Sequence, residues 1–268
     1  MPTLNLTLLA DHALPLVRRL VELAPAYTTE PPLIVDLDPR GLVSEGLGVR
    51  ALTGGLAPAL AQRSRGPVTA PTPQIGERGL RVLTPGRDLL GAYEAVLAAG
   101  GRLAGALNPM DALAGLREAQ EAEFVITVAD PTPSALQMAA IGIADDILLV
   151  LENSEVLPAE LDAKVRLVQK IAQARGRLSA NGLFAGLQGL TPPPSHWRLV
   201  HAIANGLGDD PLPDALREQW DALDAELGEA EHATVMIDIA ALPHPEDEPD
   251  TWTGALLGLL GDPEADEA

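Results

Sequence analysis

The sequence predicts an α/β fold in which helices cover both faces of a mostly parallel, twisted sheet. Short apolar runs alternate along the chain with segments of helical periodicity. These runs are apolar almost throughout, which is typical of parallel strands buried on both faces. With 268 residues, 47% of them hydrophobic, the chain can bury one large core. We therefore expect a single domain over residues 1–260 and an acidic, disordered tail over residues 261–268.

The chain begins with a strand, a helix and a second strand. Residues 4–9 are mostly apolar and predict a strand, and apolar residues at helical spacing predict a helix over residues 14–23. Residues 33–37 predict a second, fully buried strand. Asp38-Pro39-Arg40-Gly41 ends that strand in a turn, because proline cannot donate to a strand ladder and glycine frees the backbone.

The remainder of the chain continues this alternation, and no internal repeat interrupts it. Further strands are predicted at residues 80–83, 124–128, 147–151, 180–187 and 234–239. Further helices are predicted at residues 88–99, 109–122, 134–143, 158–175, 195–205, 213–227 and 251–260. Residues 50–79 show little pattern, and the Gly-, Pro- and Arg-rich part at 62–78 predicts a mobile surface excursion.

The charge balance disfavours nucleic acid and membrane as partners. Eighteen Lys and Arg stand against 38 Asp and Glu, a net charge of −20 that repels phosphate backbones and anionic lipids. The absence of cysteine excludes disulfides and thiolate metal sites and fits a reducing compartment. No apolar run reaches the ~18 residues of a membrane span, and the first residues show no signal-peptide pattern. We therefore expect a soluble, cytoplasmic protein.

Two carboxylates lie where the strand at 33–37 ends. Asp36 is the polar residue within that strand, and Asp38 opens the turn after it. Ligands of open α/β sheets bind at the carboxyl ends of the strands, so both are candidate site residues. The alternative is that Asp38 only caps the turn. The histidines predict no metal site, because His196 and His201 would lie on different faces of the helix predicted at 195–205.

Four segments, taken in order, carry a resemblance to a known family. Residues 33–41 read L-I-V-D-L-D-P-R-G, and residues 45–49 read E-G-L-G-V. Residues 80–94 read L-R-V-L-T-P-G-R-D-L-L-G-A-Y-E, residues 144–150 read A-D-D-I-L-L-V after the strand at 124–128, and later strands follow at 180–187 and 234–239. They resemble the ParA/MinD family of deviant P-loop ATPases, which position chromosomes, plasmids and other cargo. The resemblance covers about residues 1–240 and implies a P-loop NTPase-like sheet of the ParA/MinD type.

The phosphate loop of that family is not found at the matching place. The family needs K-G-G-x-G-K-[ST] there, since the glycines let backbone N–H groups hold phosphates and the lysines neutralise them. This chain has Ala10, Asp11, His12 and Ala13 instead, and its first lysine is Lys164. We therefore interpret residues 10–13 as a vestigial phosphate-loop position.

The same resemblance makes Asp36, Asp38 and Asp130 the vestigial positions for magnesium and water. Strand length places Val128 at the family's Walker-B aspartate, and an alternative alignment places Asp130 there. A triphosphate beside these carboxylates would face like charges that each cost ~1 kcal/mol at 4 Å even in bulk water. Asp36 and Asp38 would then serve as caps or pair with Arg40.

The sequence therefore predicts a degenerate ParA-like protein that binds and positions other proteins and is not an ATPase. It would have no cofactor, no catalytic residue and no metal, and would form a homodimer or pair with a ParA-type ATPase or a basic adaptor. One alternative is an active partition ATPase that binds ATP and magnesium, using Arg18 or a partner's arginine with Asp38 or Asp130. Another is a nucleic-acid-binding partition accessory protein with an arginine patch formed by Arg63, Arg65, Arg78, Arg81 and Arg87.

Two further resemblances have other implications. Residues 6–12 with Arg18 and Arg19 superficially resemble a response-regulator receiver, but the interval from Asp11 to Asp36 is too short for the receiver's chain path. The apolar helix at 252–260 resembles the membrane-targeting tail of MinD-type proteins. It carries no Lys or Arg and is flanked by acids, so we expect it to dock on the protein or contact another subunit.

Overall fold

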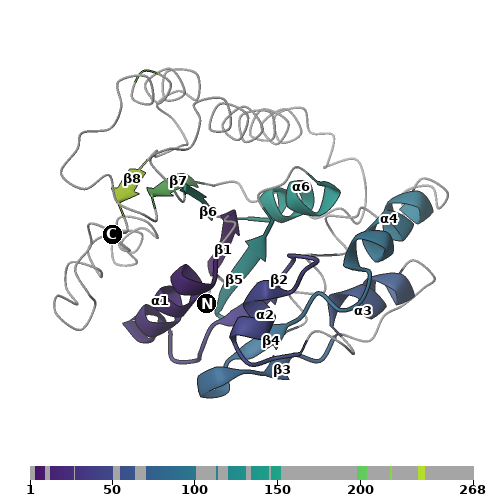
Figure 1. The fold of residues 1–268 in the computed structure, drawn as a ribbon, viewed down its shortest axis with the longest axis horizontal. Coiled ribbons are helices and arrows are strands. Elements are labelled where there is room, and N and C mark those ends of the chain that lie inside the picture. The colour runs from purple at the N-terminus through teal and green to yellow at the C-terminus, as the bar shows by residue number, and fades with distance from the viewer. Residues whose placement is uncertain are drawn as a thin grey trace.

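The computed structural model describes residues 4–9, 13–26, 28–50, 55–63, 71–100, 113, 120–130, 134–144, 146–151, 198–203, 218 and 235–238. Figure 1 shows the described strands in the middle of the molecule, with the described helices packed beside them.

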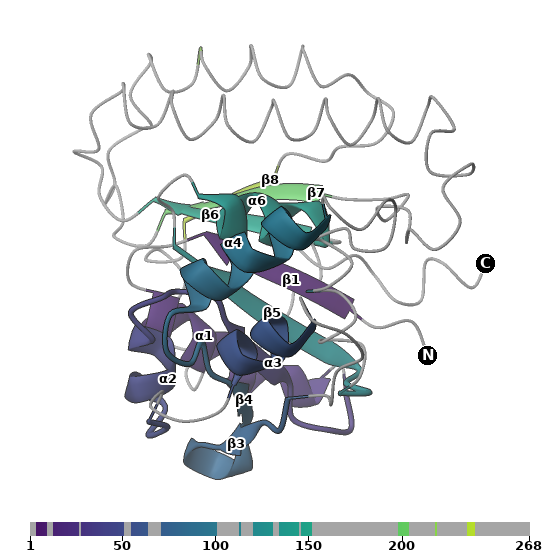
Figure 2. The same cartoon turned by 90° about the vertical axis from the view of Figure 1, so that its right-hand side faces the viewer.

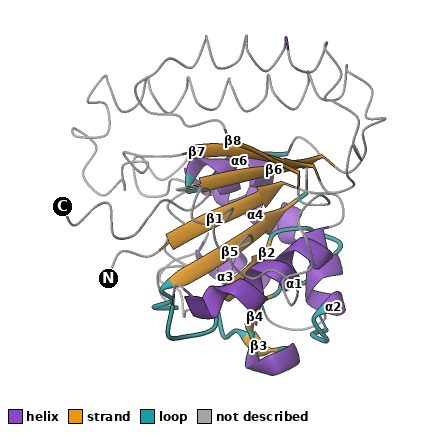
Figure 3. Cartoon of the chain, turned by 90° about the vertical axis from the view of Figure 1, so that its left-hand side faces the viewer, coloured by secondary structure: helices purple, strands orange, loops and turns teal. Residues whose placement is uncertain are grey.

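One sheet runs through the described part of the chain. Its strands are β1 (Leu4–Leu9), β2 (Leu33–Asp36), β3 (Gln74–Ile75), β4 (Arg81–Leu83), β5 (Phe124–Ala129), β6 (Asp146–Leu151), β7 (Arg198–Ile203) and β8 (Val235–Asp238). They form an eight-stranded sheet in the order β3-β4-β2-β5-β1-β6-β7-β8, which Figure 3 shows from one side. All neighbours pair in parallel except β3, which pairs antiparallel with β4 at the edge. The predicted mostly parallel sheet is confirmed.

Helices lie on both faces of this sheet. The described α-helices are α1 (Ala13–Leu23), α2 (Leu42–Gly46), α3 (Leu56–Arg63), α4 (Leu89–Gly100) and α6 (Ala135–Gly142), and short 3-10 turns follow at Ala24–Ala26 and Glu77–Gly79. α1 and α2 share one buried core, and α3, α4 and α6 share a second core on the opposite face. Figure 1 shows α3 and α4 on the right of the strands and α1 on the left, and Figure 2, viewed from that right-hand side, shows α3 and α4 in front of the strands. The predicted covering of both faces is confirmed.

Strand β2 shows why the sequence runs are apolar throughout. Leu33 and Val35 belong to the core that contains α3 and α4, whereas Ile34 belongs to the core that contains α1 and α2. All three side chains are at most 2% exposed. Since successive strand residues point to opposite faces, a strand covered on both sides needs apolar residues at every position.

Most predicted elements within the described residues are confirmed, including the strands at 4–9, 33–37, 80–83, 124–128, 147–151 and 234–239 and the helices at 14–23, 88–99 and 134–143. The helix predicted at 109–122 does not reach its predicted end, because residues 120–122 are not helical. The elements predicted at 158–175, 180–187 and 251–260, and the tail at 261–268, lie outside the described residues. Only Glu218 is described from the helix predicted at 213–227, and it is helical.

The helix predicted at 195–205 is wrong, because residues 198–203 form strand β7 between β6 and β8. The six residues R-L-V-H-A-I include four apolar ones, which suit a strand as well as a helix, and so short a run has no periodicity that separates the two. His201 therefore stands in the sheet, in register with Leu149, and the helix-face argument about the histidines does not apply. His196 lies outside the described residues.

The segment at 62–78, which was predicted to be a mobile surface excursion, contains regular structure where it is described. Helix α3 reaches Arg63, and residues 74–75 form the edge strand β3. The helix was missed because its eight residues are mainly alanine and leucine beside a proline, while its buried residues Leu56, Ala57 and Leu60 give only two turns of pattern. Among the described residues, no helix has the length and apolar character needed to cross a bilayer.

Candidate functional site

The candidate site residues lie at the carboxyl ends of two neighbouring strands. Asp36 is the last residue of β2 and stands in register with Val128 of β5. Asp38 lies two residues beyond β2, and Asp130 is the first residue beyond β5. Because β2 and β5 are adjacent and parallel, the sheet brings the three predicted carboxylates to one edge.

Of the predicted phosphate-loop residues, only Ala13 is described. It is the first residue of α1, and it is buried at 3% exposure in the core beneath that helix. Ala10, Asp11 and His12 lie outside the described residues. The vestigial phosphate loop therefore stays a prediction.

Asp36 joins the end of β2 to the start of α2. Its carboxylate is fully buried and accepts hydrogen bonds from the Ser44 hydroxyl at 2.6 Å, the Ser44 N–H at 2.8 Å and the Asp38 N–H at 3.1 Å. The first N–H groups of a helix lack partners within the helix, and no side chain at Gly41 caps α2. Asp36 supplies the missing acceptor, so it holds the turn after β2 in place.

The environment of Asp36 shifts its proton affinity. The pKa of the Asp36 carboxyl is raised from 3.8 to about 6, mainly because the group is buried, and the negative charge of Asp38 contributes to this rise. The hydrogen bonds from Ser44 and from the Asp38 N–H oppose this rise, because they stabilise the ionised form. At neutral pH the native protein therefore carries a buried, mainly ionised carboxylate at this edge of the sheet.

Asp38 is engaged by the turn that it opens. Its side chain is 6% exposed, and its Oδ1 accepts from the Arg40 N–H at 2.9 Å and from the Arg40 Nε at 2.9 Å. The Gly41 N–H donates to the Asp38 carbonyl oxygen at 2.8 Å and closes the turn. Gly41 has a φ of 68°, which favours glycine at this position. The predicted pairing of Asp38 with Arg40 is thus present in the structure.

Arg40 connects the two strand ends. While its Nε contacts Asp38, another guanidinium nitrogen lies 3.3 Å from Oδ2 of Asp130. The planar guanidinium suits this arrangement because it presents several donors in a fixed fork. Sequence reasoning paired Arg40 with Asp38 alone and missed the contact with Asp130. Both preceding strands were predicted, but only their pairing in the sheet brings the residues that follow them together.

The described carboxylates do not fit a magnesium ion as they stand. All the described hydrogen bonds to Asp36 come from its own turn and α2, and Arg40 contacts both carboxylate oxygens of Asp38 and Oδ2 of Asp130. Magnesium needs free oxygen ligands in near-octahedral geometry. No group of three or more His, Asp and Glu side chains in the described part of the chain is arranged to hold a metal ion.

The arginines named in the alternative hypotheses are engaged elsewhere or far apart. Arg18 donates to the Gly46 carbonyl oxygen at 2.8 Å and pairs with Glu77 at 3.4 Å, so it braces α1 against the end of α2. Of the proposed basic patch, Arg78 pairs with Glu22 and Arg81 with Glu30. Arg87 follows the opposite end of β4 from Arg81. Arg65 and the side chain of Arg63 lie outside the described residues.

Comparison by sequence gives no match: no protein-family model matches the chain, and none of the curated proteins matches it significantly. Comparison by structure does. Cobyrinic acid a,c-diamide synthase from Mycobacterium smegmatis, solved with an ATP analogue and magnesium, aligns with a TM-score of 0.56 at 16% identity over 82% of each chain. A variant of McdA from Cyanothece, solved with ATP, aligns with a TM-score of 0.56 at 14% identity over 98% of this chain and 93% of McdA.

A third match is a plasmid partition protein from Borrelia burgdorferi, with a TM-score of 0.53 at 11% identity over 96% of this chain and 99% of that chain. At these identities the matches establish the fold alone. This chain has the α/β fold of ParA-type P-loop proteins, as the sequence predicted.

Proposed function

We propose that this protein is a ParA-like positioning module related to chromosome or plasmid partition, which binds other proteins and does not hydrolyse ATP. The observation that carries this proposal is the Arg40 bridge between Asp38 and Asp130. In this bridge Arg40 pairs with two of the carboxylates that the resemblance assigns to magnesium and water, so both are engaged in contacts within the protein.

The distribution of cations supports the same conclusion. Phosphoryl transfer depends on positive charge placed around the transferring phosphate. The first lysine of this chain is Lys164, so no lysine can come from the segment between β1 and α1. At the ends of β2 and β5, Arg40 is a cation that already pairs with two carboxylates, Asp38 and Asp130. Freeing Arg40 for a phosphate would break charge-assisted contacts worth on the order of 1 kcal/mol each at a half-exposed position.

Calorimetry tests this proposal directly. We expect titration of the full chain with Mg-ATP or Mg-ADP to release no binding heat at nucleotide concentrations up to about the millimolar range that weak sites require. The variant Arg40→Ala, titrated in the same way, is the matched control, because it removes the bridge and leaves residues 10–13 unchanged. Micromolar binding of either nucleotide to the wild-type chain would contradict the proposal.

An active partition ATPase is the second candidate, and the ATP and ATP-analogue complexes among the structural matches favour it. In that case Arg18 or a partner's arginine would act with Asp38 or Asp130. ATP turnover that disappears in Asp38→Ala would support this candidate. Absence of turnover, alone and with DNA or a basic partner protein added, would exclude it.

The charge of the chain supports a basic protein as the partner. A net charge of −20 attracts Lys- and Arg-rich surfaces and raises their association rates, an effect that salt weakens. We expect a Lys-rich peptide to bind more tightly than a Glu-rich peptide of equal length, with an affinity that falls as salt rises. Fluorescence anisotropy measures both affinities, and equal binding of the two peptides would argue against a basic partner.

A further inference from the structure

Helix α2 is too short to hold its own position. It has five residues, whereas isolated helices shorter than ~12–15 residues are marginal in water even with favourable sequences. Gly41 offers α2 no side-chain cap, and the acceptor for the N–H and the hydroxyl of Ser44 is Asp36, eight residues earlier in the chain. The position of α2 is therefore set by the groups that contact it.

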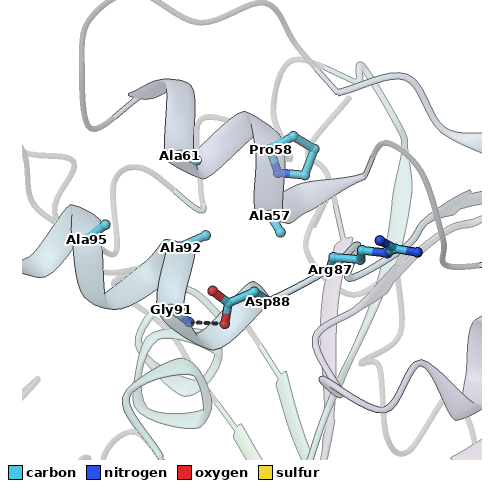
Figure 4. A pocket seen from close by; sticks show the side chains of 8 residues that line it. All are labelled: Ala57, Pro58, Ala61, Arg87, Asp88, Gly91, Ala92 and Ala95. Carbon is cyan, nitrogen blue, oxygen red and sulfur yellow. Dashed lines mark hydrogen bonds between the residues drawn. The ribbon is translucent and has the colours of Figure 1, made fainter.

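Helix α4 shows the contrast. It has twelve residues and its own cap, because Asp88 at its start accepts the Gly91 N–H at 3.2 Å (Figure 4). The carbonyl oxygen of Asp88 also accepts the Ala92 N–H at 2.9 Å. Residues of a single turn thus fix the start of α4, whereas α2 depends on residues of other elements.

Helix α1 contacts the last residue of α2, Gly46, at two points. Leu14 of α1 lies directly against Gly46, where an added Cβ would be 2.9 Å from one methyl carbon of Leu14 and closer still to the other. Four residues later, on the same face of α1, Arg18 donates to the Gly46 carbonyl oxygen at 2.8 Å. The two side chains therefore hold both the Cα and the carbonyl group of Gly46.

Residues 76–78, which follow β3, contact the same end of α2. The Glu77 N–H donates to the Leu47 carbonyl oxygen at 2.9 Å, and a Cβ at Gly76 would lie 2.7 Å from that oxygen. The Glu77 carboxylate pairs with Arg18 at 3.4 Å, so one side chain of α1 joins α2 to this turn. Three residues thus fix the end of α2, and we call them the α2 clamp: Leu14, Arg18 and Glu77.

We propose that the α2 clamp positions the carboxylates at the end of β2, which it controls through α2. Ser44 lies two residues before Gly46 in this short helix, and its N–H and hydroxyl both donate to Asp36. Asp36 in turn accepts the Asp38 N–H at 3.1 Å and so fixes the turn from which Arg40 forms its bridge. Displacement of the clamp would therefore loosen the bridge from a distance.

The effect should be local. The side chains of Arg18 and Glu77 are 49% and 52% exposed, and ion pairs at such positions contribute little to global stability. The opening of one segment can still change strongly, because different parts of a protein open with different free energies. The clamp would act in the same way in a positioning module and in an ATPase, so its test is independent of the function proposed above.

Amide hydrogen exchange, measured by NMR on the full chain, tests this proposal. In Arg18→Ala, the amides of Ser44 and Asp38 should exchange about tenfold faster or more than in the wild type, because α2 opens more often. The Ile126 amide in β5 should keep its rate. The NMR signal of the Arg40 Nε–H, which Asp38 accepts at 2.9 Å, gives an independent reading of the bridge and should move toward the position of a free arginine.

A second clamp variant tests the same contact without a change of charge. Gly46→Ala forces Leu14 away from the end of α2 and should reproduce the faster exchange of Ser44 and Asp38.

Two control variants separate the clamp from general effects. Arg19→Ala is the matched control, because it removes the same charge one residue along α1, where the side chain pairs with Glu22 at 3.2 Å. It should leave the Ser44 amide at its wild-type rate. Asp88→Ala removes the local cap of α4 and should speed exchange at Gly91 without an effect on Ser44.

Three results would overturn the proposal. The first is exchange of Ser44 and Asp38 at the wild-type rate in both Arg18→Ala and Gly46→Ala. The second is a loss of protection that extends equally to β5, since the clamp would then stabilise the whole fold. The third is an equal effect of Arg19→Ala, which would trace the change to the charge of α1.

Discussion

Asp36 makes a prediction about pH that can be worked from the structure. Its carboxyl has a pKa of about 6 in the native protein and an ordinary value of 3.8 when the chain is unfolded. Between these two values the native state binds more protons than the unfolded state. The contribution of this group to the free energy of unfolding therefore falls as pH rises from about 4 to about 6. It is fully favourable only below pH 4.

The magnitude follows from the size of the shift. One pKa unit corresponds to 1.36 kcal/mol, so a rise from 3.8 to about 6 costs the native protein about 3 kcal/mol once the carboxyl is ionised. Asp36→Asn removes the titrating group and keeps its shape. The asparagine brings a penalty of its own, because its amide NH₂ must face an N–H donor of either Ser44 or Asp38. That penalty does not vary with pH.

Urea unfolding of the wild type and of Asp36→Asn, measured in parallel at several values between pH 4 and pH 7, isolates this contribution. The other 37 acidic residues titrate in both proteins, so their effects cancel in the difference. We expect the stability advantage of the wild type over Asp36→Asn to shrink by about 3 kcal/mol between pH 4 and pH 7. A difference that stays constant, or that grows with pH, would refute the raised pKa.

The remaining predictions concern the turn after β2 and a close approach beneath α3. Arg40→Ala removes the guanidinium that pairs with Asp38 and Asp130. This change should lower the free energy of unfolding, measured with urea at low salt, by about 1 kcal/mol. High salt should reduce that loss, whereas an unchanged loss would show that the bridge is not electrostatic. Gly55→Ala should lower the melting temperature more than Gly79→Ala, since both glycines have positive φ and a Cβ is crowded by Thr84 at Gly55 alone. Equal shifts in thermal melts would contradict this.

The fold was predictable from sequence where the strands are covered on both faces. The run at 33–37 is apolar on both sides because Ile34 and Val35 enter different cores, so burial left a clear pattern. The helix–strand error at 198–203 arose because the short, mixed run R-L-V-H-A-I has no distinct period. Only the pairing of β7 with β6 and β8, which is not encoded locally, settles its conformation.

The candidate site was predictable in part. The positions of Asp36, Asp38 and Asp130 at one edge follow from strands that end with acidic residues. Their partners were harder to foresee. The contact of Arg40 with Asp130 joins residues that are distant in sequence, and the burial that raises the pKa of Asp36 depends on the packing of α2. Both depend on tertiary structure.

The edge strand β3 also affects how the protein behaves at high concentration. An exposed sheet edge offers unpaired N–H and C=O groups on which a strand from another molecule can add, which leads to aggregation. β3 has only two residues, and Pro73 precedes it without an N–H to offer. The side-chain amide of Gln120 donates a hydrogen bond to the carbonyl oxygen of Pro71 at 2.8 Å, so this acceptor is already used. At this edge the sheet gives an incoming strand almost no ladder to continue, so its growth into a fibril from this side is blocked.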